Sequence, residues 1–308
     1  MPEFGLISGI WKSIFHSISA FCNAGIDLIG SNSFAPYADN VLINLTTMTL
    51  IVVGGIGFPV WWDVVRVTRK LVEEKLSLRV FFKKLELHSK VAIASTLTLI
   101  IGGAILIFAL EYSNNSTIGT MPAWEKIMAS FFQSITTRTA GYFTISQSGL
   151  RESTAFVCIL LMFIGGSPSG TAGGIKTVTM ATILISTWAV IKGNQDAELF
   201  HRKVSAAYCR KALAVSCFSL LVLISSTLLL SVVENADFLD IMYETTSAIG
   251  TVGLTRDLTP TLSVLGKIII IMTMYLGRIG PITLALILNP QKTNKRKLTL
   301  PEEAVLIG

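Results

Sequence analysis

Charged residues are scarce in this sequence of 308 residues. Asp, Glu, Lys and Arg make up 14% of the chain, whereas 51% of its residues are hydrophobic. Soluble globular domains usually carry roughly 25% charged residues. With a mean hydropathy of +0.64, this balance argues against a soluble domain and indicates a membrane protein.

Metal-ligating and catalytic residue types are also few. The three histidines and four cysteines show none of the short spacings of a zinc site, a redox motif or a disulfide framework. Paired carboxylates at helix depth are missing, because Glu111 and Glu234 lie near the ends of apolar runs and Glu244 lies on a short amphipathic segment. We therefore expect no cofactor in this chain and no membrane-embedded enzyme site.

Lys and Arg are unevenly distributed. Net charge is +6, and of 25 basic residues eight lie in 63–90, five in 192–211 and four after residue 289. These three segments alternate with apolar runs, so the positive-inside tendency predicts that all three are cytoplasmic, and no nucleic-acid partner is needed to explain the charge. Segment 63–90 would also suit a lipid surface or a docking partner, although orientation of the chain is an equal explanation for it.

Three uncharged runs are long enough to cross a bilayer as helices. They are Val41–Trp62, Val91–Leu110 and Ala212–Val233, of 20 or 22 residues each. Two further runs are interrupted, one at Lys176 and one at Arg278. We expect no cleavable signal peptide, because no charged region precedes the first apolar segment.

A short segment occurs three times along the chain. Each copy has about a dozen amphipathic residues, too few to cross a bilayer, then a small polar stretch and a long apolar run. The glycines that end the polar stretches, Gly25, Gly141 and Gly253, are 116 and 112 residues apart. We interpret the copies as re-entrant half-helices returning as loops that line a water-filled cavity. The predicted fold is all-α and integral to the membrane, with helix, pore loop, helix units around a central ion pathway.

The glycine-ended stretches predict a path for cations. Backbone carbonyls of converging loops can replace the hydration shell of an ion, and glycine tolerates the positive φ that aims such carbonyls inward. The half-helices would point the negative ends of their dipoles at the same axis. The predicted filter residues are Asn23, Ala24, Gly25, Thr139, Ala140, Gly141, Thr251, Val252 and Gly253.

These stretches resemble the filters of the second, third and fourth repeats of KtrB-type subunits in the Trk/Ktr/HKT family of potassium transporters. The resemblance rests on Asn23–Gly25, Thr137–Gly141 and Gly250–Thr255, and it extends over nearly the whole chain. Phe163–Lys176 is similar to the family's intramembrane gating loop, and Gly277–Pro281 to the motif with an arginine below the filter. The family has four repeats, and we expect the first repeat and the outer helix of the second to be absent from this chain.

The broken span predicts a gate. Its glycines, proline and small hydroxyl residues unwind a helix, and the resemblance implies that the unwound part closes the pore; a plain kink is the alternative. The implied gate residues are Gly165, Gly166, Ser167, Gly170, Gly173, Gly174 and Arg278. Arg138 lies inside a filter stretch, where an exposed cation would repel the ion. We expect it to turn behind the loop and brace the filter by pairing with Glu244.

The resemblance also implies function and partners. It implies potassium uptake across a bacterial plasma membrane by a multi-pass, non-enzymatic protein, with potassium as substrate and sodium as a candidate activator. The implied partners are a second copy in a homodimer, a cytoplasmic nucleotide-binding ring of RCK type and the lipid bilayer. Two alternatives stay open: the potassium-binding subunit of a P-type ATPase complex, and a non-conducting truncated fragment.

The predicted division of the chain follows the repeats. It gives 1–62 as pore loop and inner helix of the second repeat, 63–90 as a cytoplasmic basic segment, 91–191 as the third repeat with a broken inner helix, 192–211 as a cytoplasmic segment, 212–288 as the fourth repeat and 289–308 as a cytoplasmic tail.

Overall fold

The computed structural model describes residues 4–30, 32–75, 80–194 and 196–279. Within these ranges the regular secondary structure is helical except for one short hairpin, which agrees with the predicted all-α class. The helices are α1 (Leu6–Phe21), α2 (Val41–Gly55), α3 (Phe58–Glu73), α4 (Phe81–Lys84), α5 (Leu87–Glu111), α6 (Ala123–Thr136), α7 (Glu152–Phe163), α8 (Thr177–Ile191), α9 (Ala206–Val233), α10 (Phe238–Gly250) and α11 (Val264–Ile279). The hairpin pairs β1 (Ala197–Leu199) with β2 (Arg202–Val204), and 3-10 turns occupy Ala35–Tyr37 and Thr259–Thr261.

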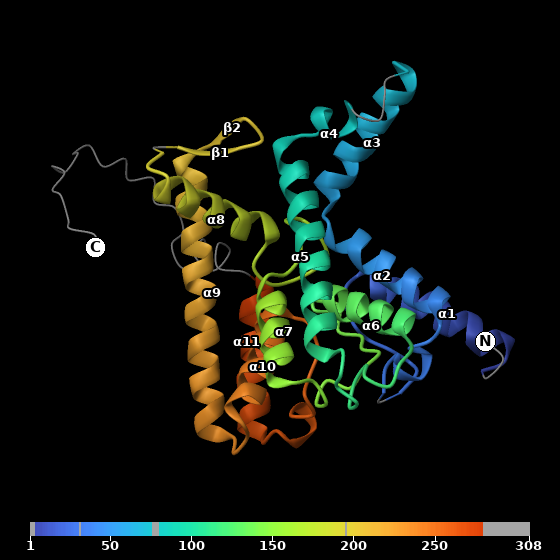
Figure 1. Cartoon of the computed structure of the whole chain (residues 1–308). Coiled ribbons are helices and arrows are strands. Elements are labelled where there is room, and N and C mark those ends of the chain that lie inside the picture. Colours follow the sequence, from blue (N-terminus) through green and yellow to red (C-terminus); the bar gives the residue numbers. More distant parts are fainter. Residues whose placement is uncertain (1–3, 31, 76–79, 195, 280–308) are drawn as a thin grey trace.

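Short helices lie at the predicted half-helix positions. α1 packs on α2, α6 on α5, and α10 on α7, α9 and α11. In Figure 1, α5 and α9 run along much of the molecule, and the shorter α6, α7 and α10 lie beside them. α6 and α10 are buried along most of their C-terminal halves. The core of the molecule therefore surrounds α6 and α10, whereas most of α1 is not buried.

Two of the three long uncharged runs form continuous helices. α5 contains Val91–Leu110 and α9 contains Ala212–Val233, and both helices are long and apolar enough to cross a membrane. The third run, Val41–Trp62, is not one continuous helix. Instead α2 and α3 are bent by 98° at a break between them.

The break after α2 has a local cause and a tertiary one. Gly57 has a φ of 95°, which glycine adopts without a Cβ penalty. Pro59 lies in the first turn of α3, where its missing N–H leaves no hydrogen bond unmade. The carbonyl oxygen of Gly55 accepts from the N–H of Ser167 at 2.9 Å, and that of Gly54 from Thr171 at 3.2 Å. The end of α2 thus binds another segment instead of continuing its own ladder.

The interrupted span is broken as predicted. α7 ends at Phe163, α8 begins at Thr177, and the residues between them form no helix. We call residues 164–176 the intramembrane loop. Ile164 and Ile175 form an isolated parallel bridge, so the two ends of the loop are held side by side.

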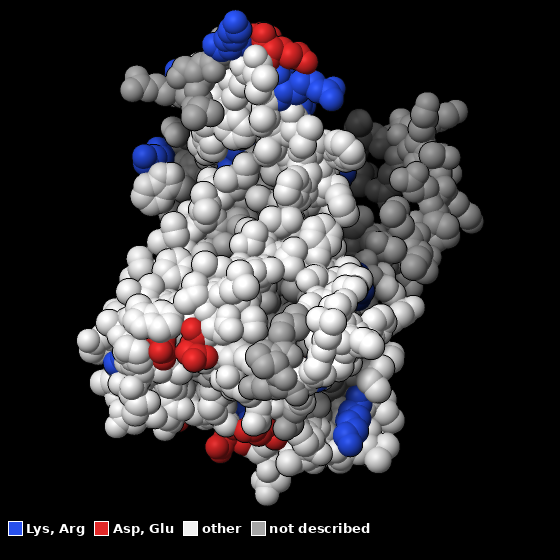
Figure 2. Space-filling model, turned by 90° about the vertical axis from the view of Figure 1, so that its right-hand side faces the viewer, with Lys and Arg blue, Asp and Glu red and all other residues white. Residues whose placement is uncertain are grey.

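Two of the basic segments lie at the same end of the molecule. The α3–α4 tip and the β1–β2 hairpin are both at the top of Figure 1. Figure 2 shows charged side chains gathered at that tip and a broad, largely uncharged surface below it. At the tip, Lys84 Nζ donates a hydrogen bond to Glu74 Oε2 at 2.7 Å. This bond lowers the pKa of the Glu74 carboxylate. The predicted domain boundaries remain predictions, and the tail 289–308 lies outside the described residues.

Candidate ion-conducting site

The three predicted filter stretches share one backbone conformation. In each, the first and third residues have positive φ. The values are 50° and 65° at Asn23 and Gly25, 68° and 91° at Thr139 and Gly141, and 52° and 92° at Thr251 and Gly253. Positive φ is uncommon outside glycine, so its recurrence at equivalent positions three times marks a common local structure.

The three glycines meet around Gly141. A Cβ atom added to Gly25 would overlap the carbonyl oxygen of Ala140 and lie 3.0 Å from the Cα of Gly141. A Cβ on Gly141 would overlap the carbonyl oxygen of Val252, and one on Gly253 would lie 3.9 Å from the Cα of Gly141. Segments more than 100 residues apart in sequence are therefore in backbone contact, with glycine at each point of contact.

Each filter stretch is attached to the C-terminal end of a short helix. The N–H of Ala24 donates to Ser19 O at 2.9 Å, and the equivalent N–H of Val252 donates to Ser247 O at 2.8 Å. The third-repeat stretch differs by one residue, since Ala140 N donates to Thr136 O at 2.9 Å. The stretches thus begin where the helix dipoles are negative.

The intramembrane loop contacts the first residue of every filter stretch. The hydroxyl oxygen of Thr171 lies 2.7 Å from Asn23 Oδ1, and the N–H of Gly173 donates to Thr139 Oγ1 at 3.0 Å. A Cβ on Gly173 would overlap Thr251 Oγ1. The loop therefore lies across one end of all three stretches, the end nearest the short helices.

Two cationic side chains hold the carbonyl groups of this loop. Arg278 Nη1 donates to Thr171 O at 3.0 Å, and Lys176 Nζ donates to Ala172 O at 2.7 Å. Both side chains line a cavity of about 450 Å³, together with Phe163 and Phe218. Lys176 was not among the predicted gate residues, although a lysine interrupting an apolar run was a usable signal for it.

The expected pair between Arg138 and Glu244 is wrong for the described structure. Arg138 Nη2 donates to the carbonyl oxygen of Gly165 at 2.8 Å, in the intramembrane loop. Glu244 accepts from the hydroxyls of Thr255, at 2.7 Å, and Thr259. Each side chain finds polar partners nearer to it, Arg138 toward the loop and Glu244 in the return segment of its own repeat. Arg138 thus contacts the intramembrane loop, and Glu244 contacts the segment that follows the filter residue Gly253.

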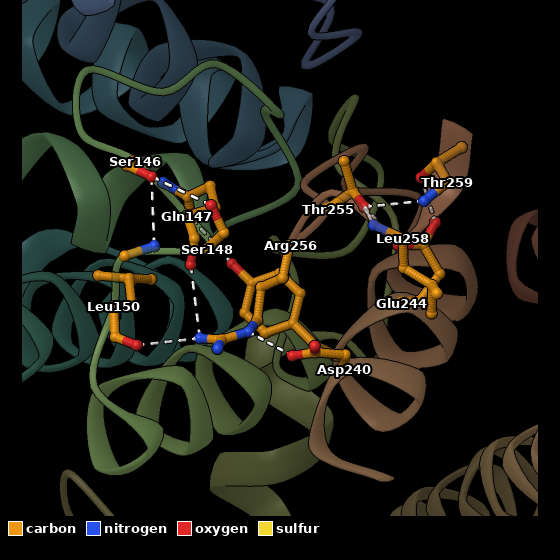
Figure 3. A network of polar contacts seen from close by, with 12 residues as sticks. Ser146, Gln147, Ser148, Leu150, Asp240, Glu244, Thr255, Arg256, Leu258 and Thr259 are labelled. Atoms are coloured by element: carbon orange, nitrogen blue, oxygen red, sulfur yellow. Dashed lines mark hydrogen bonds and ion pairs between the residues drawn. The ribbon is translucent and has the colours of Figure 1, made fainter. Parts of the chain in front are cut away.

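Arg256 forms an ion pair within the fourth repeat and a hydrogen bond to the third repeat, and sequence reasoning missed both. Arg256 Nε lies 2.6 Å from Asp240 Oδ1, and Arg256 Nη1 donates to Leu150 O at 3.1 Å. Figure 3 shows the Arg256 guanidinium between Asp240 and the segment from Ser146 to Leu150. Because Arg256 and Leu150 are 106 residues apart, no short motif could have revealed the contact.

Buried polar groups strengthen both joints between neighbouring repeats. The amides of Gln133 and Gln147 bind each other at 2.8 and 3.0 Å, and the Tyr243 hydroxyl donates to Gln147 Oε1 at 2.9 Å. Between the second and third repeats, the Tyr142 hydroxyl donates to Ile26 O at 3.2 Å. Ile26 and Tyr142 directly follow the filter glycines Gly25 and Gly141, so this bond links two stretches at the ends opposite those that the loop contacts. Among the described residues no cluster of His, Cys, Asp and Glu suits a metal ion.

Known proteins resemble this chain over nearly its whole length. Residues 4–297 match the family described as TrkH, cation transport protein. The chain belongs to this family. It is 40% identical over 308 residues to the Ktr system potassium uptake protein B of Bacillus subtilis, covering 100% of this chain and 66% of the relative. It is 39% identical over 314 residues to the potassium/sodium uptake protein NtpJ of Enterococcus hirae, again covering 100% and 66%.

A solved structure has the same fold. The potassium transporter TrkH from Vibrio parahaemolyticus superposes with a TM-score of 0.73 at 16% identity, covering 91% of this chain and 58% of that one. At this identity the likeness concerns the fold alone. Family membership and the apolar helices make the chain part of a multi-pass membrane protein of this family. The chain spans 66% of the length of the first two relatives.

Proposed function

We propose that the complete protein takes up potassium through a pore whose selectivity filter includes Asn23–Gly25, Thr139–Gly141 and Thr251–Gly253. The observation that carries the proposal is the threefold recurrence of positive φ at the first and third residues, with the glycine backbones in contact. Such a conformation turns successive carbonyl groups toward a common axis, where they substitute for the hydration shell of the ion. The names of the two relatives, both uptake proteins for potassium or for potassium and sodium, agree with this substrate.

The intramembrane loop and Arg278 form the gate of this pore. The loop touches Asn23, Thr139 and Thr251, so an ion leaving the filter would meet it directly. It would also meet the positive charge of Arg278, which repels cations. Opening requires the loop to leave these contacts, and its glycine content makes the backbone rearrangement inexpensive.

The remaining third of the relatives' length completes the pore. Among the described residues, the Cβ position of Gly253 has only the Cα of Gly141 within 4 Å, and the three atoms nearest to that of Gly25 belong to Ala140 and Gly141. A further pore loop would fit between Gly25 and Gly253, on the side where the described residues bring no third contact. The exposed apolar face of α1, with Leu6, Ile10 and Trp11, suits packing against additional membrane helices.

The cytoplasmic end of the protein carries segments 63–90 and 192–211. Their Lys and Arg residues place this end inside by the positive-inside tendency, in a plasma membrane. A ring of nucleotide-binding subunits of RCK type would dock there, on a homodimer of the pore subunit, and sodium would act as activator. These assignments rest on the family resemblance and on the Ktr-system name of the Bacillus relative.

Gradient-driven flux tests the proposal. The complete protein, reconstituted in liposomes with its regulatory partner, should take up potassium along an imposed gradient without ATP hydrolysis. Empty liposomes are the control. Uptake that requires ATP hydrolysis would favour the ATPase-subunit alternative, and no cation uptake at all would contradict the proposal.

A further inference from the structure

Arg138 is a buried cation whose polar atoms are not all satisfied by protein groups. The residue is 6% exposed, and its Nη2 donates to Gly165 O at 2.8 Å. Within the described residues, Nη1 has no hydrogen-bond partner, and Nη2 bonds a carbonyl oxygen rather than a carboxylate. Leaving a donor of a buried charged group unpaired is costly, so an additional partner is expected at Nη1.

Thr96, in the middle of α5, has the same property. The residue is 4% exposed, and its Oγ1 has no hydrogen-bond partner among the described residues. This is unlike the nearby Thr98, whose hydroxyl donates to Ala94 O at 2.9 Å in the usual helical manner. The Thr96 hydroxyl forgoes that bond, which indicates a partner elsewhere.

Arg138 and Thr96 line one small cavity. Its volume is about 10 Å³ for the centre of a water-sized sphere, close to the lower limit of roughly 10–15 Å³ for a single water molecule. The complete lining is Ile51, Val52, Gly55, Thr96, Arg138 and Gly166. Two of its lining residues, Arg138 and Thr96, carry the polar atoms that lack a partner among the described residues, and the cavity is too small for an organic ligand.

We propose that one ordered water molecule occupies this cavity, accepting a hydrogen bond from Arg138 Nη1 and bonded to Thr96 Oγ1. Gly55 also lines the cavity. Its carbonyl oxygen accepts from Ser167 N and keeps a second lone pair that can accept a third bond from the water. A buried water typically makes about three such bonds. A chloride ion would satisfy the guanidinium, but it is larger than water and the cavity has room for a water at most.

The water acts as a joint between the filter and the loop. The cavity wall comes from the end of α2, from α5, from Arg138 directly before the filter residues Thr139–Gly141, and from the intramembrane loop. By satisfying Nη1, the water holds the guanidinium with Nη2 on Gly165, so Arg138 is a positioning residue for the first part of the loop. This role is independent of which ion the protein carries.

An experimental structure of the complete protein, at a resolution that shows ordered water, tests the site directly. We expect one density peak at about 2.7–3.2 Å from both Arg138 Nη1 and Thr96 Oγ1. An empty cavity would overturn the proposal. So would an anomalous peak there in crystals grown with bromide in place of chloride, because the occupant would then be an anion.

Variants at Thr96 test the consequence for the loop. In the complete protein, Thr96→Val keeps the shape of the side chain and removes its hydroxyl, whereas Thr96→Ser keeps the hydroxyl. Amide hydrogen exchange in peptides covering 164–176 should be about two- to tenfold faster in Thr96→Val, the factor expected for loss of one hydrogen bond. Thr96→Ser should retain wild-type exchange.

The matched control is Thr98→Val, on the exposed side of the same helix, and it should not change exchange in the loop. Wild-type exchange in Thr96→Val, or equal acceleration in Thr96→Ser, would overturn the positioning role.

Discussion

Arg278 Nη1 donates a 3.0 Å hydrogen bond to the carbonyl oxygen of Thr171, 107 residues earlier in the chain. The bond ties the inner helix of one repeat to the intramembrane loop of another. Thr171 also contacts Asn23 in a filter stretch. A continuous series of contacts thus runs from α11 through the loop to the filter stretch. If the loop is a gate, these are the bonds that must break when it opens.

Removing the Arg278 side chain should favour the open gate. Arg278→Ala loses a hydrogen bond from a charged donor, which typically contributes about 1.5–3 kcal/mol, so the ratio of open to closed states should rise at least about tenfold. Potassium flux through the complete protein should increase and depend less on the regulatory partner. Arg278→Lys, which keeps a charge, should be closer to wild type. Flux at or below the wild-type level in Arg278→Ala, with normal membrane insertion, would contradict the prediction.

Shortening the intramembrane loop should also increase potassium flux. Deleting Ser167–Gly173 removes the hydrogen bonds to Gly54 and Gly55 together with the contacts to the filter stretches. Flux measured in proteoliposomes should exceed that of the wild type. A deletion that inserts normally and still conducts no faster would leave the loop as a structural element.

Arg138 and Glu244 should behave independently. They share no bond or partner in the structure, since Arg138 binds Gly165 and Glu244 binds Thr255 and Thr259. In a double-mutant cycle of Arg138→Gln and Glu244→Gln, the changes in unfolding free energy should add within about 0.5 kcal/mol. A larger coupling energy would contradict this independence and favour a direct interaction between Arg138 and Glu244.

Arg256 and Asp240 should be coupled. Their charged atoms lie 2.6 Å apart and their side chains are 11% and 26% exposed. A cycle of Arg256→Gln and Asp240→Asn should give a coupling energy of about 0.5–3 kcal/mol, the range for residues in one network. The exposed pair of Lys203 and Asp196, also 2.6 Å apart but 61% and 45% exposed, is the control and should couple by less than about 1 kcal/mol. Equal coupling in the two pairs would contradict a stronger interaction in the less exposed pair of Arg256 and Asp240.

The sequence predicted those features that repeat or that follow from local chemistry. The spacing of Gly25, Gly141 and Gly253 located the short helices, and the glycines after Phe163 located the break between α7 and α8. The bend after α2 was missed because the count of uncharged residues took precedence over the Gly and Pro signals at Gly57 and Pro59.

Tertiary partners could not be read from the sequence in the same way. Arg138 had several polar groups within reach of its long side chain, and only the fold brings Gly165 rather than Glu244 to it. The contact between Arg256 and Leu150 depends on how two repeats meet. Such pairs are set by the packing of distant segments, which hydrophobic periodicity does not specify.

Relative uptake of potassium and sodium by Gly253→Ser in the complete protein tests the filter most directly. Gly253 has a φ of 92°, so a side chain there strains the backbone and displaces the carbonyl groups that replace water around the ion. Gly102→Ala is the control, because its added Cβ meets no atom within 4 Å. The filter assignment predicts that Gly253→Ser lowers the preference for potassium over sodium while Gly102→Ala leaves it unchanged. An unchanged preference in a Gly253→Ser protein that inserts and conducts normally would contradict it.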